Sequence, residues 1–207
     1  IPHGSGNVKQ ISDYCVDFAK QHGLKYRQDE SLNVIIWKDG TSGYENSPAV
    51  ILQGHIDMVA VKEEDCIKDM EKEGLDLEIQ DGYLSAKQTS LGGDDGIAVA
   101  YSLALLASTD IPHPPLEAVF TVDEEIGMLG AAAIDLSDLN GKIMLNMDSE
   151  DEGIFLAGCA GGASVRCDIP VTKGTETGVG RTLTLKGFTG GHSGTEIICQ
   201  RANTNVL

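Results

Sequence analysis

The sequence AVILQGHID at residues 49–57 decides the fold. Its first half is apolar on both faces, which predicts a central strand in a sheet that helices cover on each side. The strand ends in His55 and Asp57, two side chains suited to metal binding or proton transfer. Because open α/β sheets place their ligand sites at the carboxyl ends of strands, we expect a site there.

Two more apolar runs end in acidic residues. Residues 116–122 predict a strand followed by Glu124 and Glu125, and residues 142–147 predict a strand followed by Asp148. A Gly-rich loop, LGGDDG, adds Asp94 and Asp95. We therefore expect these carboxylates to meet His55 at one edge of the sheet.

Helical spacing over residues 8–22, 96–108 and 129–134 alternates with these strands and with another over 32–37. The segment 96–108 is apolar all round, which predicts a buried helix, and Asp81-Gly82 predicts a hairpin turn. The fold class we expect is α/β, a mixed sheet flanked by helices.

The texture changes after the Gly-rich residues 157–162. Apolar and polar residues then alternate around Val165–Val171 and Leu183–Leu185, the pattern of an antiparallel sheet with one wet face, and residues 205–207 resemble the middle of a helix. We expect a first domain over residues 1–162 and the beginning of a second, α+β domain over 163–207. About 45 residues are few for a stable domain, so we expect the chain to be incomplete.

The charge balance narrows the range of partners. Thirty-two acidic residues against 15 Lys and Arg give a net charge of −17, which repels nucleic acids and anionic membranes. No apolar run approaches the roughly 20 residues of a membrane span. Five cysteines without CxxC spacing suit reduced thiols. We expect a cytoplasmic protein.

One imidazole among several carboxylates, with no cysteine, is a ligand mixture for Zn²⁺, Mn²⁺ or Co²⁺. Without a cation, such close carboxylates would repel one another. Taken singly, each signal has an ordinary explanation. His55 and Asp57 could form a structural hydrogen bond, Glu124 and Glu125 could favour a helix N-terminus, and Asp94 could be a helix cap. No EF-hand loop or GxGxxG motif is present.

Several motifs occur together in a recognisable order. They are IPHGSGN at 1–7, VILQGHIDMV at 50–59, TSLGGDDGIAVA at 89–100, PPLEAVFTVDEEIGMLGA at 114–131, MLNMDSEDEG at 144–153, CAGGA at 159–163 and KGFTGGHSG at 186–194. In these motifs the chain resembles the aminoacyl-histidine dipeptidases, a branch of the M20 metallopeptidases. The resemblance covers nearly the whole sequence.

The resemblance implies an amide hydrolase with two divalent metal ions, Zn²⁺ first and Mn²⁺ or Co²⁺ as alternatives. His55 and Asp148 would bind one metal, Glu125 would bind the other, and Asp94 would bridge both. It also implies a zinc-peptidase catalytic domain interrupted by a lid domain, and a homodimer is plausible on the same ground.

Three further roles follow from the resemblance. Glu124 would be the general base, Asp57 would orient the imidazole of the metal-binding histidine, and His192 would hold substrate or stabilise the oxyanion. The implied reaction is hydrolysis of short peptides, Xaa-His dipeptides first. The alternatives are another M20 amidohydrolase, a carboxypeptidase or an N-acyl amino acid deacylase, and a metal-binding homologue without activity.

The chain departs from the family pattern at two points. Gly93 and Asp95 stand where Ala and Asn are expected, and the Asp95 charge could compete as a ligand. The family's last metal ligand is a histidine near the C-terminus, and no histidine follows His192. We therefore expect residues 1–207 alone to bind the second metal poorly and to turn over slowly, if at all.

Overall fold

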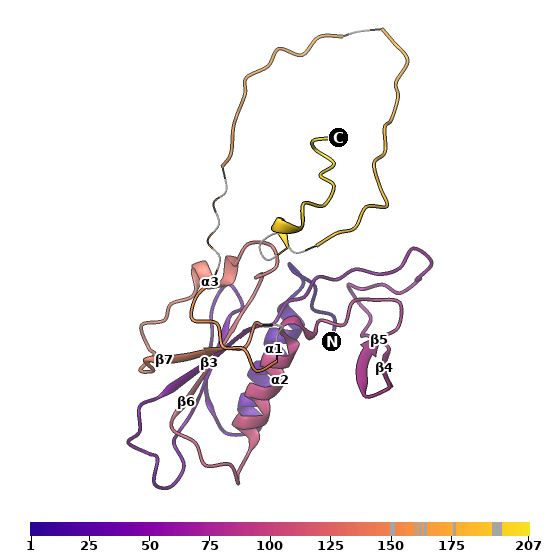
Figure 1. Ribbon diagram of the computed structural model, residues 1–207. Helices are drawn as coiled ribbons and strands as arrows, with labels where there is room; N and C mark the ends of the chain where they lie inside the picture. Colours follow the sequence, from indigo (N-terminus) through magenta and orange to yellow (C-terminus); the bar gives the residue numbers. More distant parts are fainter. Residues whose placement is uncertain (150–151, 160, 162, 164, 176, 192–195) are drawn as a thin grey trace. The chain divides into compact units, whose positions relative to one another are not determined.

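The computed structural model (Figure 1) describes residues 1–149, 152–159, 161, 163, 165–175, 177–191 and 196–207. Its contacts divide the chain into two units, residues 1–150 and 151–207. The first unit holds the strands and α-helices of the described residues, and the second holds a short 3-10 helix, η1 (Ile197–Cys199).

A five-stranded mixed sheet forms the centre of the first unit, which confirms the expected α/β class. The strand order is β1-β2-β6-β3-β7. Strand β3 runs parallel to β6 and β7, β2 runs antiparallel to β6, and β1 runs antiparallel to β2. The bounds are β1 Lys25–Gln28, β2 Val34–Lys38, β3 Val50–His55, β6 Leu116–Thr121 and β7 Ile143–Asn146.

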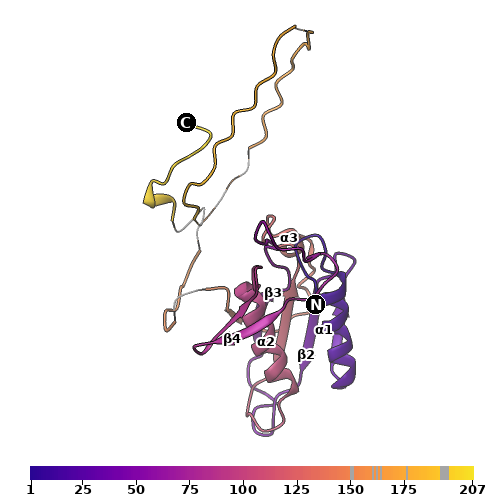
Figure 2. The ribbon, with the colours of Figure 1, turned by 90° about the vertical axis from the view of Figure 1, so that its right-hand side faces the viewer.

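The two long helices, α1 (Lys9–Gln21) and α2 (Gly93–Ala107), pack on the same face of the sheet. Figure 2 shows both beside the strands. Their buried apolar residues form one core with alternate residues of β2 and β6, among them Ile36 and Phe120, which are 0% exposed. Strand β3 approaches α2 closely at Gly54, where a Cβ atom would lie 2.6 Å from the Cβ of Ala98.

The opposite face carries no long helix among the described residues, which differs from the expectation of helices on both sides. Helix α3 (Leu129–Ala133) is short. The buried Glu117 carboxylate accepts hydrogen bonds at 2.9 Å from the backbone N–H groups of Asn140 and Gly141. These bonds fix the turn that leads into β7, the strand that precedes Asp148.

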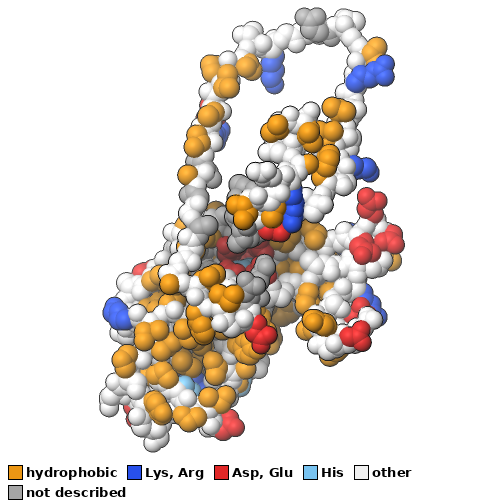
Figure 3. Space-filling model, viewed as in Figure 1, with side chains coloured by type: hydrophobic (Ala, Val, Ile, Leu, Met, Phe, Trp, Pro, Cys, Tyr) orange, Lys and Arg blue, Asp and Glu red, His pale blue; other side chains and the backbone are white. Residues whose placement is uncertain are grey.

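Two apolar surfaces of the first unit are exposed. Helix α2 buries one side only, because Ile97 and Tyr101 on its other side are 50% and 58% exposed. Apolar side chains also gather around the edge strand β7 (Figure 3), where residues 143–145 are about half exposed. The sequence predicts that α2 is buried; one face of the helix is buried against the sheet, and the other face is exposed.

The expected hairpin is confirmed. Strands β4 (Leu77–Gln80) and β5 (Tyr83–Ala86) pair antiparallel across Asp81 and Gly82, whose φ angles are 53° and 84°. Such positive φ values at both turn residues match the right-handed twist of a tight hairpin. Within the described ranges, no helix is both long and apolar enough to cross a membrane.

The second unit differs from its sequence pattern. Residues 165–175 and 177–191 form no strand, although their alternation predicts an antiparallel sheet, and residues 204–206 form a turn instead of a helix. Val165 and Leu183 are 85% and 86% exposed. Since these side chains bury little apolar surface, the main driving force for a sheet is missing. The expected division at residues 162 and 163 stays a prediction.

Candidate metal centre

The carboxyl ends of β3, β6 and β7 and the start of α2 deliver the predicted side chains to one place. His55 is the last residue of β3 and is 1% exposed. The loop after β6 carries Glu124 and Glu125, and Asp148 follows β7. This is the edge at which parallel strands of α/β sheets place ligand sites.

The two ring nitrogens of His55 have different surroundings. Nδ1 lies 3.0 Å from the carbonyl oxygen of Asp57 and 3.3 Å from its Oδ1, whereas Nε2 lies 3.1 Å from Oδ1 of Asp94. Both neighbours of Nδ1 are oxygen atoms of Asp57 that can only accept a hydrogen bond. Nδ1 therefore carries a hydrogen and donates it to Asp57. Nε2 is then the ring atom that can bind a metal.

Two groups of side chains have metal-ligand geometry, and both include His55. One consists of His55, Asp94 and Glu125, and the other of His55, Asp95 and Asp148, with ligand atoms within 4.8 Å of one another in each group. An imidazole nitrogen with carboxylate oxygens suits a borderline divalent cation. The donor set of these residues therefore fits a metal.

The neighbouring aspartates Asp94 and Asp95 have different environments, although a cis peptide bond joins them. The Asp94 carboxylate is 59% exposed and lies near Glu125. Asp95 is 1% exposed, and its Oδ2 accepts the backbone N–H of His55 at 3.3 Å. The family resemblance implies that Asp94 is the bridging ligand, whereas the geometry places Asp95, and not Asp94, in one ligand group with Asp148.

Asp57 organises this end of the sheet through its buried carboxylate. Its Oδ1 accepts the backbone N–H of Glu124 at 3.0 Å, and its Oδ2 accepts that of Glu125 at 3.3 Å. The Ser5 hydroxyl donates to Oδ2 at 2.8 Å. One side chain thus holds both the imidazole and the loop that carries the two glutamates.

The pKa values follow from burial and from the excess of negative charge. Burial alone would lower the pKa of His55, but the hydrogen bond and charge of Asp57, with the charges of Asp148 and Asp95, raise it to about 10. Burial, together with the charge of Asp148, raises the pKa of Asp95 to about 7. When no cation is bound, protons on His55 and Asp95 would reduce the negative charge of the site.

The two glutamates differ in one respect. Burial and neighbouring carboxylates raise the pKa of both Glu124 and Glu125. Only Glu125 belongs to a ligand group, since Glu124 lies in neither. Glu124 is therefore a carboxylate that lies next to the centre but belongs to neither group of potential metal ligands.

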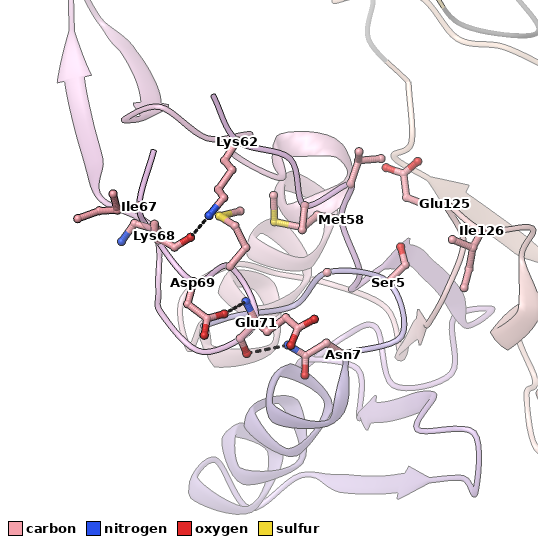
Figure 4. Close-up of a pocket in the computed structure, with 14 residues that line it drawn as sticks. Ser5, Asn7, Met58, Lys62, Ile67, Lys68, Asp69, Glu71, Glu125 and Ile126 are labelled. Atoms are coloured by element: carbon pink, nitrogen blue, oxygen red, sulfur yellow. Dashed lines mark hydrogen bonds between the residues drawn. The ribbon is translucent and has the colours of Figure 1, made fainter. Parts of the chain in front are cut away.

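A cavity of about 750 Å³ adjoins the centre at Glu125 (Figure 4). Ser5, Met58 and Ile126 line it near Glu125, and Lys62 and Ile67 line its far side. Sequence reasoning missed this cavity and the contact of Ser5, although the motif IPHGSGN pointed to the segment. His192 lies outside the described residues.

The fold and the site together define a mixed α/β domain with a histidine–carboxylate centre at the sheet edge. No family model matches the chain. Among curated proteins, it is 40% identical to a cytosol non-specific dipeptidase of Escherichia coli over 212 residues, which cover 100% of this chain and 43% of that relative. The chain thus spans less than half the length of this relative.

Solved structures give the same picture. An aminoacylhistidine dipeptidase from Vibrio alginolyticus superposes with a TM-score of 0.71 and 44% identity, over 74% of this chain and 31% of that one. A tripeptidase from Staphylococcus aureus, 24% identical over 73% of this chain and 40% of its own, shares the fold with a TM-score of 0.60. The similarity to the two dipeptidases, at 40% and 44% identity, confirms the resemblance to the aminoacyl-histidine dipeptidases.

The raised pKa of His55 has a consequence for the stability of the metal-free protein. The pKa of His55 in the folded protein, about 10, lies above its ordinary value of 6.5, so the protonated ring stabilises the fold fully below pH 6.5. This contribution is lost as the pH rises through 10. We expect the Tm of the metal-free protein to fall between these values, and His55→Gln to flatten that part of the curve. Parallel curves for the two proteins would contradict the assignment.

Proposed function

We propose that this chain supplies the metal centre of a peptidase that hydrolyses short peptides, Xaa-His dipeptides first. The observation that carries the proposal is the pair of ligand groups around His55, with Glu124 beside them and in neither. Similarity to a cytosol non-specific dipeptidase and to an aminoacylhistidine dipeptidase supports the substrate class. A cytoplasmic location accords with the name of the first relative.

We infer that two divalent cations bind here, with Zn²⁺ first and Mn²⁺ or Co²⁺ as alternatives. His55 and Asp148 would hold one cation, Glu125 the other, and Asp94 would bridge them. When bound, such cations polarise the scissile carbonyl and lower the pKa of a water molecule. Asp95, which lies in one ligand group with His55 and Asp148, would accept the backbone N–H of His55 with Oδ2 and leave the bridging position to Asp94.

Glu124 acts as the general base in this proposal. Its carboxylate accepts a proton from the attacking water and donates it to the nitrogen of the departing amine. Two features support the role: the hydrogen bond from its backbone N–H to Asp57 holds the residue in place, and the upward pKa shift from burial makes it a stronger base. A carboxylate bound to a metal could not take up the proton as readily.

The peptide has a site to occupy beside this base. The cavity next to Glu125 would receive part of the substrate, between the apolar side chains of Met58 and Ile126. His192 would contact the substrate or its oxyanion. We further propose that residues 1–162 are the catalytic domain, that residues 163–207 begin a lid, and that the protein forms a homodimer.

The base is tested with Glu124→Gln in the gene product that contains this chain. Loss of proton transfer should lower kcat on dipeptides, β-alanyl-histidine included, by about 10²- to 10⁴-fold. Metal content, measured by mass spectrometry, should stay unchanged because Glu124 belongs to no ligand group. Full activity would refute the role of Glu124, and inactivity of the wild type despite bound metal would favour a deacylase or a binding protein.

The bridging ligand is tested with the pair Asp94→Asn and Asp95→Asn. An amide oxygen can still accept the N–H of His55, so Asp95→Asn should keep metal content and activity within a few-fold. Asp94→Asn should lose both, because a bridging carboxylate serves two cations. The reverse result would assign the bridge to Asp95, beside Asp148.

A further inference from the structure

The N-terminal segment, residues 3–7, lies against the metal centre and joins two parts of it. Met58 donates its backbone N–H to the carbonyl of His3 at 3.1 Å, and Ser5 donates its own to the carbonyl of Met58 at 3.2 Å. Gly6 N–H donates to Asp123 at 2.7 Å, in the loop that carries the two glutamates. The segment therefore connects the end of β3 to the loop after β6.

Within this segment, the Ser5 hydroxyl completes the hydrogen bonding of Asp57. A carboxylate has about four acceptor positions, two on each oxygen. Oδ1 faces the Glu124 N–H at 3.0 Å and His55 Nδ1 at 3.3 Å, and Oδ2 faces the Glu125 N–H at 3.3 Å and the Ser5 hydroxyl at 2.8 Å. Ser5 makes the shortest of these four contacts and is the only hydroxyl among them.

We propose that Ser5 is a positioning residue for the metal centre, acting through Asp57 on His55, Glu124 and Glu125. Without the hydroxyl, Oδ2 keeps only the longer bond to the Glu125 N–H, so the carboxylate is held less firmly against rotation about its Cβ–Cγ bond. Such a rotation would move Oδ1 away from Nδ1, leave the Asp57 carbonyl oxygen as the acceptor for Nδ1, and change the direction of Nε2. The proposal deepens the proposed function and rests on it.

The hydroxyl is tested in the gene product with Ser5→Ala, with Ser5→Thr as the conservative variant and Ser12→Ala as the matched control. Ser12 is a buried hydroxyl, 0% exposed, with a short bond of 2.6 Å to the carbonyl of Leu32, and it lies on α1 away from the centre. Cobalt titration followed by visible absorption reports ligand geometry without turnover. Hydrolysis of β-alanyl-histidine by the Zn²⁺-loaded protein reports catalysis.

Partners behind metal ligands typically change metal affinity or activity by about 10- to 100-fold. We expect Ser5→Ala to weaken Co²⁺ binding and lower kcat by about this factor, with KM changed less than about twofold and an altered cobalt spectrum. Ser5→Thr should restore both readouts. Ser12→Ala should lower Tm but leave the cobalt spectrum and kcat unchanged.

A wild-type cobalt spectrum and affinity in folded Ser5→Ala would overturn the proposal. If Ser5→Ala does not fold, Ser5→Thr and Ser5→Val replace it, because they share a shape and differ in the hydroxyl; equal cobalt affinities would then refute it. Should the wild type hydrolyse no dipeptide while Ser5→Ala still perturbs the cobalt site, the proposed function fails and the positioning role of Ser5 stands.

Discussion

The buried charge of Asp57 is the constraint on which the rest of the centre depends. A carboxylate removed from water must find hydrogen-bond donors within the protein. Asp57 finds them on His55, on the Glu124–Glu125 backbone and on Ser5, which lie far apart in the sequence. Burial opposes the charged form, but these donors lower the pKa of Asp57 to about 2, so it stays ionised. One interaction thereby links the N-terminal segment, the end of β3 and the loop after β6.

A second constraint is the excess of negative charge around one imidazole. Asp94, Asp95, Glu125 and Asp148 have oxygens within 4.8 Å of a ring nitrogen of His55, and Glu124 lies close by. Some of this repulsion is relieved by the raised pKa values of His55 and Asp95, which means that protons occupy the site of a metal-free protein. A divalent cation would displace those protons. Metal affinity should consequently be coupled to pH, as in other sites whose ligands must lose protons.

Much of this architecture could be predicted from the sequence because it follows from local patterns. Buried strands such as residues 49–54 are apolar runs, and the hairpin at Asp81-Gly82 follows from the backbone freedom of its turn residues. Strand β1 could not be predicted, because Lys25–Gln28 is mostly polar and forms a strand by pairing with β2 at the edge of the sheet. The contact of Ser5 with Asp57 spans 52 residues, and the different surroundings of Asp94 and Asp95 depend on the loop backbone, so neither has a local signal.

In this site His55 offers Nε2 to a metal while Asp57 holds Nδ1. Anomalous diffraction from crystals of the Zn²⁺-loaded gene product, recorded on both sides of the zinc edge, tests it most directly. We expect one zinc peak within bonding distance of Nε2 and Asp148, a second beside Glu125, and Asp94 between them. A single peak away from His55, or a zinc bound to Nδ1 with Asp57 displaced, would contradict it.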